Sequence, residues 1–183
     1  FHCVHMSEHD LDLFKEKHLN IVTNPASNLK LASGIAPIQA MLQRKINICL
    51  GTDGPASNNC LDMFREMFLV TGLAKYKNCD ASAVDAYEVL KMATVNGAKA
   101  LNLNCGVLEA GKSADLIILD LHQPNMQPIH NIAKNIVYSG SKSNVKCTMV
   151  NGKILYEDGH FHVGFEIEAL YDEVQKRVER LMR

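Results

Sequence analysis

The sequence contains no tryptophan, and aromatic residues make up only 6% of its 183 positions. Proteins that bind single-stranded nucleic acids usually stack bases on aromatic rings, so this scarcity argues against that class. An excess of one charge is also missing, because 19 Lys and Arg residues are balanced by 20 Asp and Glu residues. Without a basic surface, we expect no nucleic acid partner.

The chain also shows no signal-peptide pattern and no apolar run near 18 residues, so we expect neither secretion nor membrane insertion. No CxxC pair is present, and widely spaced cysteines are typical of reduced thiols rather than of a disulfide framework or a zinc ribbon. The six cysteines are Cys3, Cys49, Cys60, Cys79, Cys105 and Cys147. These features indicate a cytoplasmic globular protein.

Strand and helix patterns alternate over the first 75 residues. The patterns predict helices over 7–18, 37–45 and 60–75, and strands over 19–24 and 46–54. A turn-rich segment, PASNLKLASG, follows the first strand. The tetrapeptide Pro-Ala-Ser-Asn occurs after both strands, at 25–28 and 55–58. This alternation predicts βα units in a parallel sheet or barrel, with ligand-binding loops after the strands.

The second half of the chain has a different pattern. Residues 82–101 read as a helix with Ser82 and Asp85 in capping-box spacing, and Asn151-Gly152 predicts a hairpin turn. The last segment places apolar residues on one helical stripe, which we expect to pack on the body of the protein. We therefore divide the chain into a barrel portion (1–103), a β-rich segment (104–163) and a closing amphipathic helix (164–183).

Five segments carry a resemblance to a known family. They are HCVHM at 2–6, NPASNLKLASGIAPI at 24–38, LGTDGPASNN at 50–59, GVLEAGKSADLIILDL at 106–121 and TMVNGKILYEDG at 148–159. In this order they resemble the amidohydrolase superfamily. The likeness is greatest to its cytosine-deaminase-like branch and, within that branch, to the 5′-methylthioadenosine/S-adenosylhomocysteine deaminases.

The resemblance implies an α/β fold: the C-terminal part of a metal-dependent (β/α)8 TIM barrel, the C-terminal part of a small β-sandwich, and a closing helix. A complete barrel takes roughly 250 residues, whereas only residues 1–103 precede the β-rich segment here. We therefore expect a C-terminal fragment that begins at the end of barrel strand six. The family's His-x-His metal pair, a further metal-binding histidine and a proton-shuttling glutamate would belong to the missing N-terminal half.

Asp53 is the strongest catalytic candidate, because it ends an apolar strand where its carboxylate can bind a divalent metal and contact a metal-bound water. The resemblance gives the matching aspartate both tasks, with zinc as the metal. It also places His2 where the family's strand-six histidine polarises the substrate at the reacting carbon. For His5, three residues further on and already in the loop, we expect a surface or substrate-adjacent role.

The two Pro-Ala-Ser-Asn loops supply candidate substrate-binding residues. Asn24, Ser27, Ser57 and Asn58 carry side chains that can hydrogen-bond a substrate, although Asn and Ser also build turns. We also count Asp53 among the substrate-binding residues. Two other motifs predict no site. GVLEAGKS at 106–113 satisfies the P-loop pattern, but a helix precedes it and a strand follows. His160 and His162 mimic the metal pair at a position that predicts an exposed strand end.

The resemblance implies that the complete protein hydrolytically deaminates adenine nucleosides such as S-adenosylhomocysteine, 5′-methylthioadenosine and adenosine, releasing ammonia. We expect the fragment alone to be inactive and the complete protein to form a homo-oligomer. Guanine deamination and triazine hydrolysis are alternatives within the same superfamily. A third alternative is a non-catalytic half-barrel whose open strand edges bind another chain.

Overall fold

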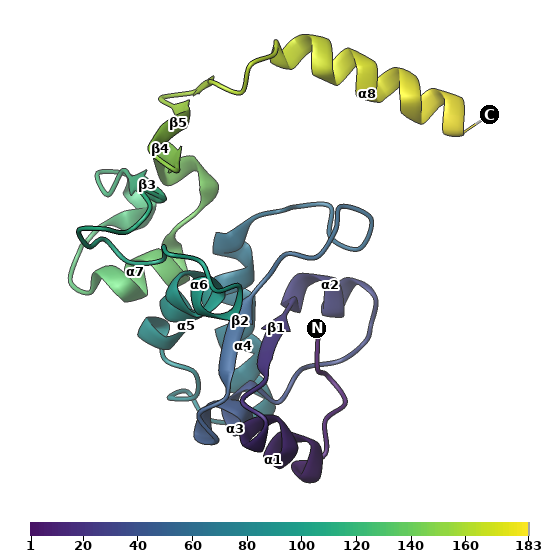
Figure 1. The fold of residues 1–183 in the computed structure, drawn as a ribbon, viewed down its shortest axis with the longest axis vertical. Coiled ribbons are helices and arrows are strands. Elements are labelled where there is room, and N and C mark those ends of the chain that lie inside the picture. The colour runs from purple at the N-terminus through teal and green to yellow at the C-terminus, as the bar shows by residue number, and fades with distance from the viewer. Residues whose placement is uncertain (183) are drawn as a thin grey trace. The chain divides into compact units, whose positions relative to one another are not determined.

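The computed structural model describes residues 1–182, and it divides into two compact units (Figure 1). The first unit comprises residues 1–112 and 121–144. The second comprises residues 113–120 and the chain from residue 145 onward. Residues 121–144 thus pack with the first unit. The predicted domain boundaries at 104 and 164 stay predictions about the complete protein.

A two-stranded parallel sheet forms the centre of the first unit. Strands β1 (Asn20–Thr23) and β2 (Asn47–Leu50) pair so that Ile21 lies opposite Ile48, and both of these side chains are fully buried. Parallel strands need a crossover connection, and the predicted βα alternation is confirmed here. The backbone N–H of His2 donates to the carbonyl of Val22 at 2.8 Å, so the N-terminal segment runs beside β1.

The predicted helices of the first 80 residues are present with shifted ends. Helix α1 (Glu8–Glu16) begins after Ser7, which forms a reciprocal capping box with Asp10. Helix α3 (Ile38–Gln43) follows Pro37, and α4 (Met63–Asn78) follows Asp62, whose carboxylate accepts from the first-turn backbone. Capping therefore explains where α1 and α4 begin.

Two local predictions are wrong. The segment after β1 is not a turn but a short helix, α2 (Pro25–Lys30), with proline in its first turn. Burial of the first four residues of this helix, Pro25 to Asn28, overrides the turn propensity of Ser and Asn. The helix predicted over 82–101 is broken at Thr94 (φ −133°, ψ −97°) into α5 (Ala86–Ala93) and α6 (Val95–Ala100). Ser82 bonds to Asp80 instead of completing a capping box.

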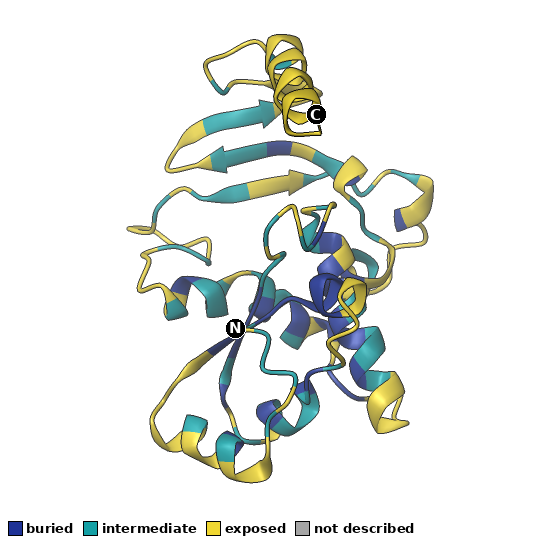
Figure 2. Cartoon of the chain, turned by 90° about the vertical axis from the view of Figure 1, so that its right-hand side faces the viewer, coloured by how far each residue is buried: buried dark blue, intermediate teal, exposed yellow. Residues whose placement is uncertain are grey.

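The remaining elements of the first unit are the 3₁₀ turns η1 (Pro124–Met126) and η2 (Lys142–Asn144) and helix α7 (Ile132–Ser139). Helix α7 packs against α4 and α5, and Met126 and Val137 are buried. Figure 2 shows buried residues concentrated on β1, β2 and the helices beside them. This core fixes the two strand ends that carry the candidate residues.

The second unit contains a four-stranded antiparallel sheet in the order β3 (Leu116–Leu119), β4 (Val145–Val150), β5 (Lys153–Glu157) and β6 (His160–Phe161). The predicted hairpin turn is confirmed, since Asn151 and Gly152 both have positive φ, as a type I′ turn requires.

The predicted C-terminal helix is present as α8 (Ile167–Leu181). None of its residues is buried (Figure 2), and the expected packing of its apolar stripe on the body stays a prediction. None of the helices described in the structure has the length and apolar character of a membrane span.

Candidate active site

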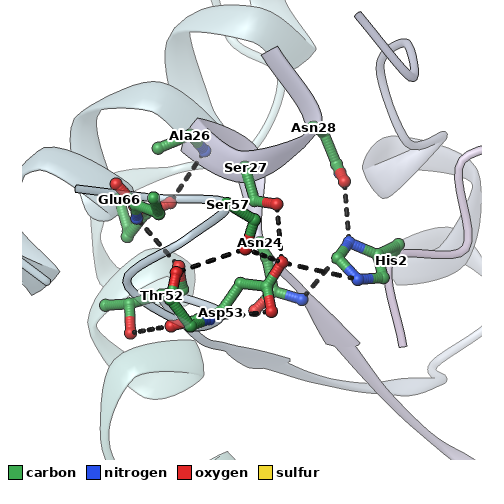
Figure 3. Close-up of polar contacts among 11 residues, drawn as sticks. His2, Asn24, Ala26, Ser27, Asn28, Thr52, Asp53, Ser57 and Glu66 are labelled. Atoms are coloured by element: carbon green, nitrogen blue, oxygen red, sulfur yellow. Dashed lines mark hydrogen bonds and ion pairs between the residues drawn. The ribbon is translucent and has the colours of Figure 1, made fainter. Parts of the chain in front are cut away.

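Helix α2, which follows β1, and the loop that follows β2 meet at the side chain of Asp53 (Figure 3). Asp53 lies three residues beyond the end of β2 and has a φ of 61°. This left-handed conformation is uncommon for a residue with a side chain, and such outliers cluster at functional sites. The sharp change of direction after the strand brings the Asp53 carboxylate to Ser27 in α2 and to Ser57 in the loop after β2.

Three donors hold the Asp53 carboxylate. The hydroxyls of Ser27 and Ser57 each donate to Oδ2 at 2.6 Å, and the backbone N–H of Gly54 donates to Oδ1 at 2.8 Å. These hydrogen bonds lower the pKa of Asp53 to about 2. The bond from Ser27 has the largest effect, followed by those from Ser57 and Gly54. Asp53 is therefore ionised at neutral pH, with a fixed orientation.

The imidazole of His2 lies beside this carboxylate. Its Nε2 is 3.9 Å from Oδ2 of Asp53, and its Nδ1 is 2.8 Å from Oδ1 of Asn28. The shorter contact of Nδ1 is with an amide oxygen, which accepts hydrogen bonds, and Nε2 is the nitrogen directed at Asp53. Since Asn28 is buried, it fixes the direction of the ring. The structure thus brings His2 and Asp53 together.

The other four predicted substrate-binding residues lie around the same point. Ser27 and Ser57 are directed at Asp53, while Asn24 places Nδ2 3.4 Å from Nδ1 of His2. Asn58 is buried and donates through Nδ2 to the carbonyl of Thr52 at 2.8 Å. Direct contact of these side chains with a substrate stays a prediction, and the bonds that they make here orient the protein's own groups.

Sequence reasoning missed two members of this network, Asn28 and Glu66. Asn28 ends the first Pro-Ala-Ser-Asn repeat, in the position that Asn58 has in the second. Because Asn58 is one of the predicted residues, the repeat could have pointed to Asn28 as well. Glu66 lies on α4, where a glutamate near a helix start is ordinary. It is nevertheless completely buried, accepting from Asn58 Nδ2 at 2.7 Å and from the Ala26 backbone at 2.9 Å. No sequence pattern distinguished it.

The other motifs stay outside this site. His5 is exposed, as are His160 and His162 near β6. The segment 106–113 precedes β3 rather than a helix, so it has none of the amide donors that a P-loop directs at phosphate. Among residues 1–182, no group of three or more His, Cys, Asp or Glu side chains is arranged to hold a metal ion.

Known proteins resemble this chain over nearly all of its length. The amidohydrolase family model matches residues 1–155. The chain is 45% identical, over all of its length, to the 5-methylthioadenosine/S-adenosylhomocysteine deaminase of Caldanaerobacter subterraneus subsp. tengcongensis, of which it covers 42%. It is also 45% identical over 181 residues to the 5′-deoxyadenosine deaminase of Methanosarcina mazei, covering 99% of this chain and 42% of that protein.

Among solved structures, the crystal structure of an adenosine deaminase from Xanthomonas campestris with bound zinc superimposes with a TM-score of 0.95 at 35% identity. The match covers 99% of this chain and 42% of that protein. The chain therefore spans less than half the length of the relatives that it matches. With most of its residues matched by one family model and its fold shared with that solved structure, the chain belongs to the amidohydrolase family.

Proposed function

We propose that this chain is the C-terminal part of a cytoplasmic, metal-dependent aminohydrolase that converts adenine nucleosides to their inosine analogues and ammonia. The observation that carries the proposal is the ionised Asp53 carboxylate, held by two serines at a strand end with His2 Nε2 3.9 Å away. The names of the relatives, which include deaminases of S-adenosylhomocysteine, 5-methylthioadenosine and 5′-deoxyadenosine, support the substrate class.

The residues of this chain fit one ligand position of a zinc site. The Asp53 carboxylate is a hard oxygen donor that already carries its charge, and zinc accepts such a ligand beside imidazoles. Catalytic zinc sites usually take three protein ligands, so further ligands would come from outside these 183 residues. The metal would supply one effect, namely acidification of a water molecule so that a weak base can remove its proton.

Asp53 and His2 would divide the work of this chain in the reaction. With its pKa lowered to about 2, Asp53 is a weak base that stays charged, so it suits metal binding and proton acceptance from an acidified water. His2, oriented by Asn28, would present Nε2 to the substrate beside the reacting carbon. Ser27 and Ser57 would keep the carboxylate from turning, because preorganised charge needs no rearrangement during reaction.

A substrate panel on the full-length protein that carries this chain tests the proposal. We expect zinc-dependent ammonia release from S-adenosylhomocysteine, 5′-methylthioadenosine or adenosine, lost on chelation and restored by zinc. Guanine and a chlorinated triazine are the competing substrates. A higher kcat/KM for either of these would overturn the adenine nucleoside assignment, and release of ammonia from none of them would overturn the enzyme itself.

A further inference from the structure

Glu66 is a carboxylate in an unusual place. It lies in the first turn of α4 and its side chain is completely buried. No Lys, Arg or His side chain within residues 1–182 forms an ion pair with it. Burial raises its pKa, and the hydrogen bonds from Ala26 and Asn58 oppose that rise only in part. Placing an unpaired carboxylate here costs stability, so its presence calls for a role beyond packing.

Each Glu66 oxygen accepts a hydrogen bond from a different segment of the chain (Figure 3). Oε2 accepts from the backbone N–H of Ala26, in the helix after β1. Oε1 accepts from Nδ2 of Asn58, in the loop after β2. The single side chain of Glu66 therefore connects the two Pro-Ala-Ser-Asn segments through hydrogen bonds.

Both contacts lie one residue from a serine that holds Asp53. Ala26 precedes Ser27, and Asn58 follows Ser57. Asn58 Nδ2 also donates to the carbonyl of Thr52, the residue before Asp53. Displacement of either segment would thus change a 2.6 Å bond to the Asp53 carboxylate.

We propose that Glu66 is a positioning residue, which sets the orientation of Asp53 by fixing the two segments that carry Ser27 and Ser57. It acts through these residues and does not touch the substrate. The kinetic part of this inference rests on the proposed deaminase function, whereas its structural part does not.

Only a carboxylate with this reach satisfies both segments. Glutamine would present an NH2 group to one of two donors, the Ala26 N–H or the Asn58 amide. Rotation of Asn58 cannot relieve the conflict, because its Oδ1 accepts from Cys60 N and its Nδ2 donates to Thr52. Glu66→Gln therefore keeps the volume of the side chain and removes one of the two bonds.

The matched control is Thr71→Val on the same helix. Thr71 is also completely buried, and its hydroxyl donates to the carbonyl of Val84 at 2.7 Å. Its replacement removes a buried hydrogen bond without touching either Pro-Ala-Ser-Asn segment. Any effect that both variants share reflects lost stability, and any effect of Glu66→Gln alone reflects positioning.

In the full-length protein, we expect Glu66→Gln to lower kcat about 10- to 100-fold with little change in KM, while Thr71→Val keeps kcat near that of the wild type. Hydrogen exchange should speed up roughly tenfold in peptides covering 25–31 and 54–60 in Glu66→Gln only. Equal exchange and equal kcat in the two variants would overturn the inference. If the wild type deaminates no nucleoside, the proposed function fails, and the exchange comparison still decides the role of Glu66.

Discussion

The hydroxyl of Ser27 donates a 2.6 Å hydrogen bond to Oδ2 of Asp53, although 26 positions separate the two residues along the chain. The bond connects the helix after β1 with the loop after β2. It is also the largest cause of the low pKa of Asp53. A contact between neighbouring strand ends thus lowers the pKa of the carboxylate at the centre of the candidate active site.

Replacement of Ser27 tests this relationship. In the full-length protein, Ser27→Ala should lower kcat about 10- to 100-fold, because a lost partner lets an active-site carboxylate turn. Steady-state deamination measures the change. Ser33→Ala, at an exposed position outside this network, is the control and should keep kcat. Unchanged kcat in Ser27→Ala would contradict the proposed importance of the bond.

The end of β2 leaves no room for a side chain at Gly51. A Cβ atom there would lie 2.5 Å from Oδ1 of Asn24 and 3.0 Å from Cγ1 of Val22. We expect Gly51→Ala to lower the free energy of unfolding by about 1–3 kcal/mol, as overpacking does. Denaturant unfolding of the full-length protein measures the change.

Gly72→Ala is the matched control for this prediction. Gly72 lies within α4, and a Cβ atom there would meet nothing within 4 Å. Alanine in a helix should stabilise by about 0.5–1 kcal/mol relative to glycine. The two substitutions are chemically identical, and only their surroundings differ. We therefore expect changes of opposite sign in the free energy of unfolding, and equal changes would refute the close approach at Gly51.

Much of the βα framework could be predicted from the sequence, because its signals are local. The capping box at Ser7 and Asp10 and the apolar strands around Ile21 and Ile48 each depend on a few neighbouring residues. The helix over Pro25–Lys30 could not be predicted in this way. Its Ser and Asn residues favour turns, and only burial against the rest of the unit makes them helical.

The candidate site shows the same division. Asp53 could be identified by its motif at the end of a strand. His2 could be identified by its likeness to a family pattern. Asn28 and Glu66 were not predicted, because their contacts are with residues 26, 40 and 8 positions away along the chain. A buried glutamate cannot be separated from an exposed one by spacing alone, because burial depends on which segments pack over it.

The raised pKa of Glu66 predicts a pH effect on stability. The folded protein holds this proton to a higher pH than the unfolded chain, whose ordinary value is 4.5. The stability that Glu66 contributes is therefore fully present below pH 4.5 and is lost as the pH rises through the folded pKa. The free energy of unfolding of the wild type, minus that of Glu66→Gln, should fall over this range. A flat or rising difference would contradict the direction of the shift.

Removal of the rest of the protein should abolish activity. These 183 residues provide Asp53 but no group of three metal-binding side chains within the described part, residues 1–182. We therefore expect the isolated chain to bind zinc weakly or not at all and to deaminate none of the nucleosides. Zinc stoichiometry after dialysis, measured beside the full-length protein, checks this. Stoichiometric zinc and turnover by the isolated chain would show that it carries a complete site.

The most direct test of the central claim is the deamination rate of Asp53→Asn in the full-length protein. Because the substitution removes the charge and the proton acceptor, kcat should fall about 10²- to 10⁴-fold. Asp85→Asn provides the same chemical change at the N-cap of α5, where asparagine caps equally well, and should keep the wild-type rate. If Asp53→Asn retains that rate as well, Asp53 is not the centre of the active site.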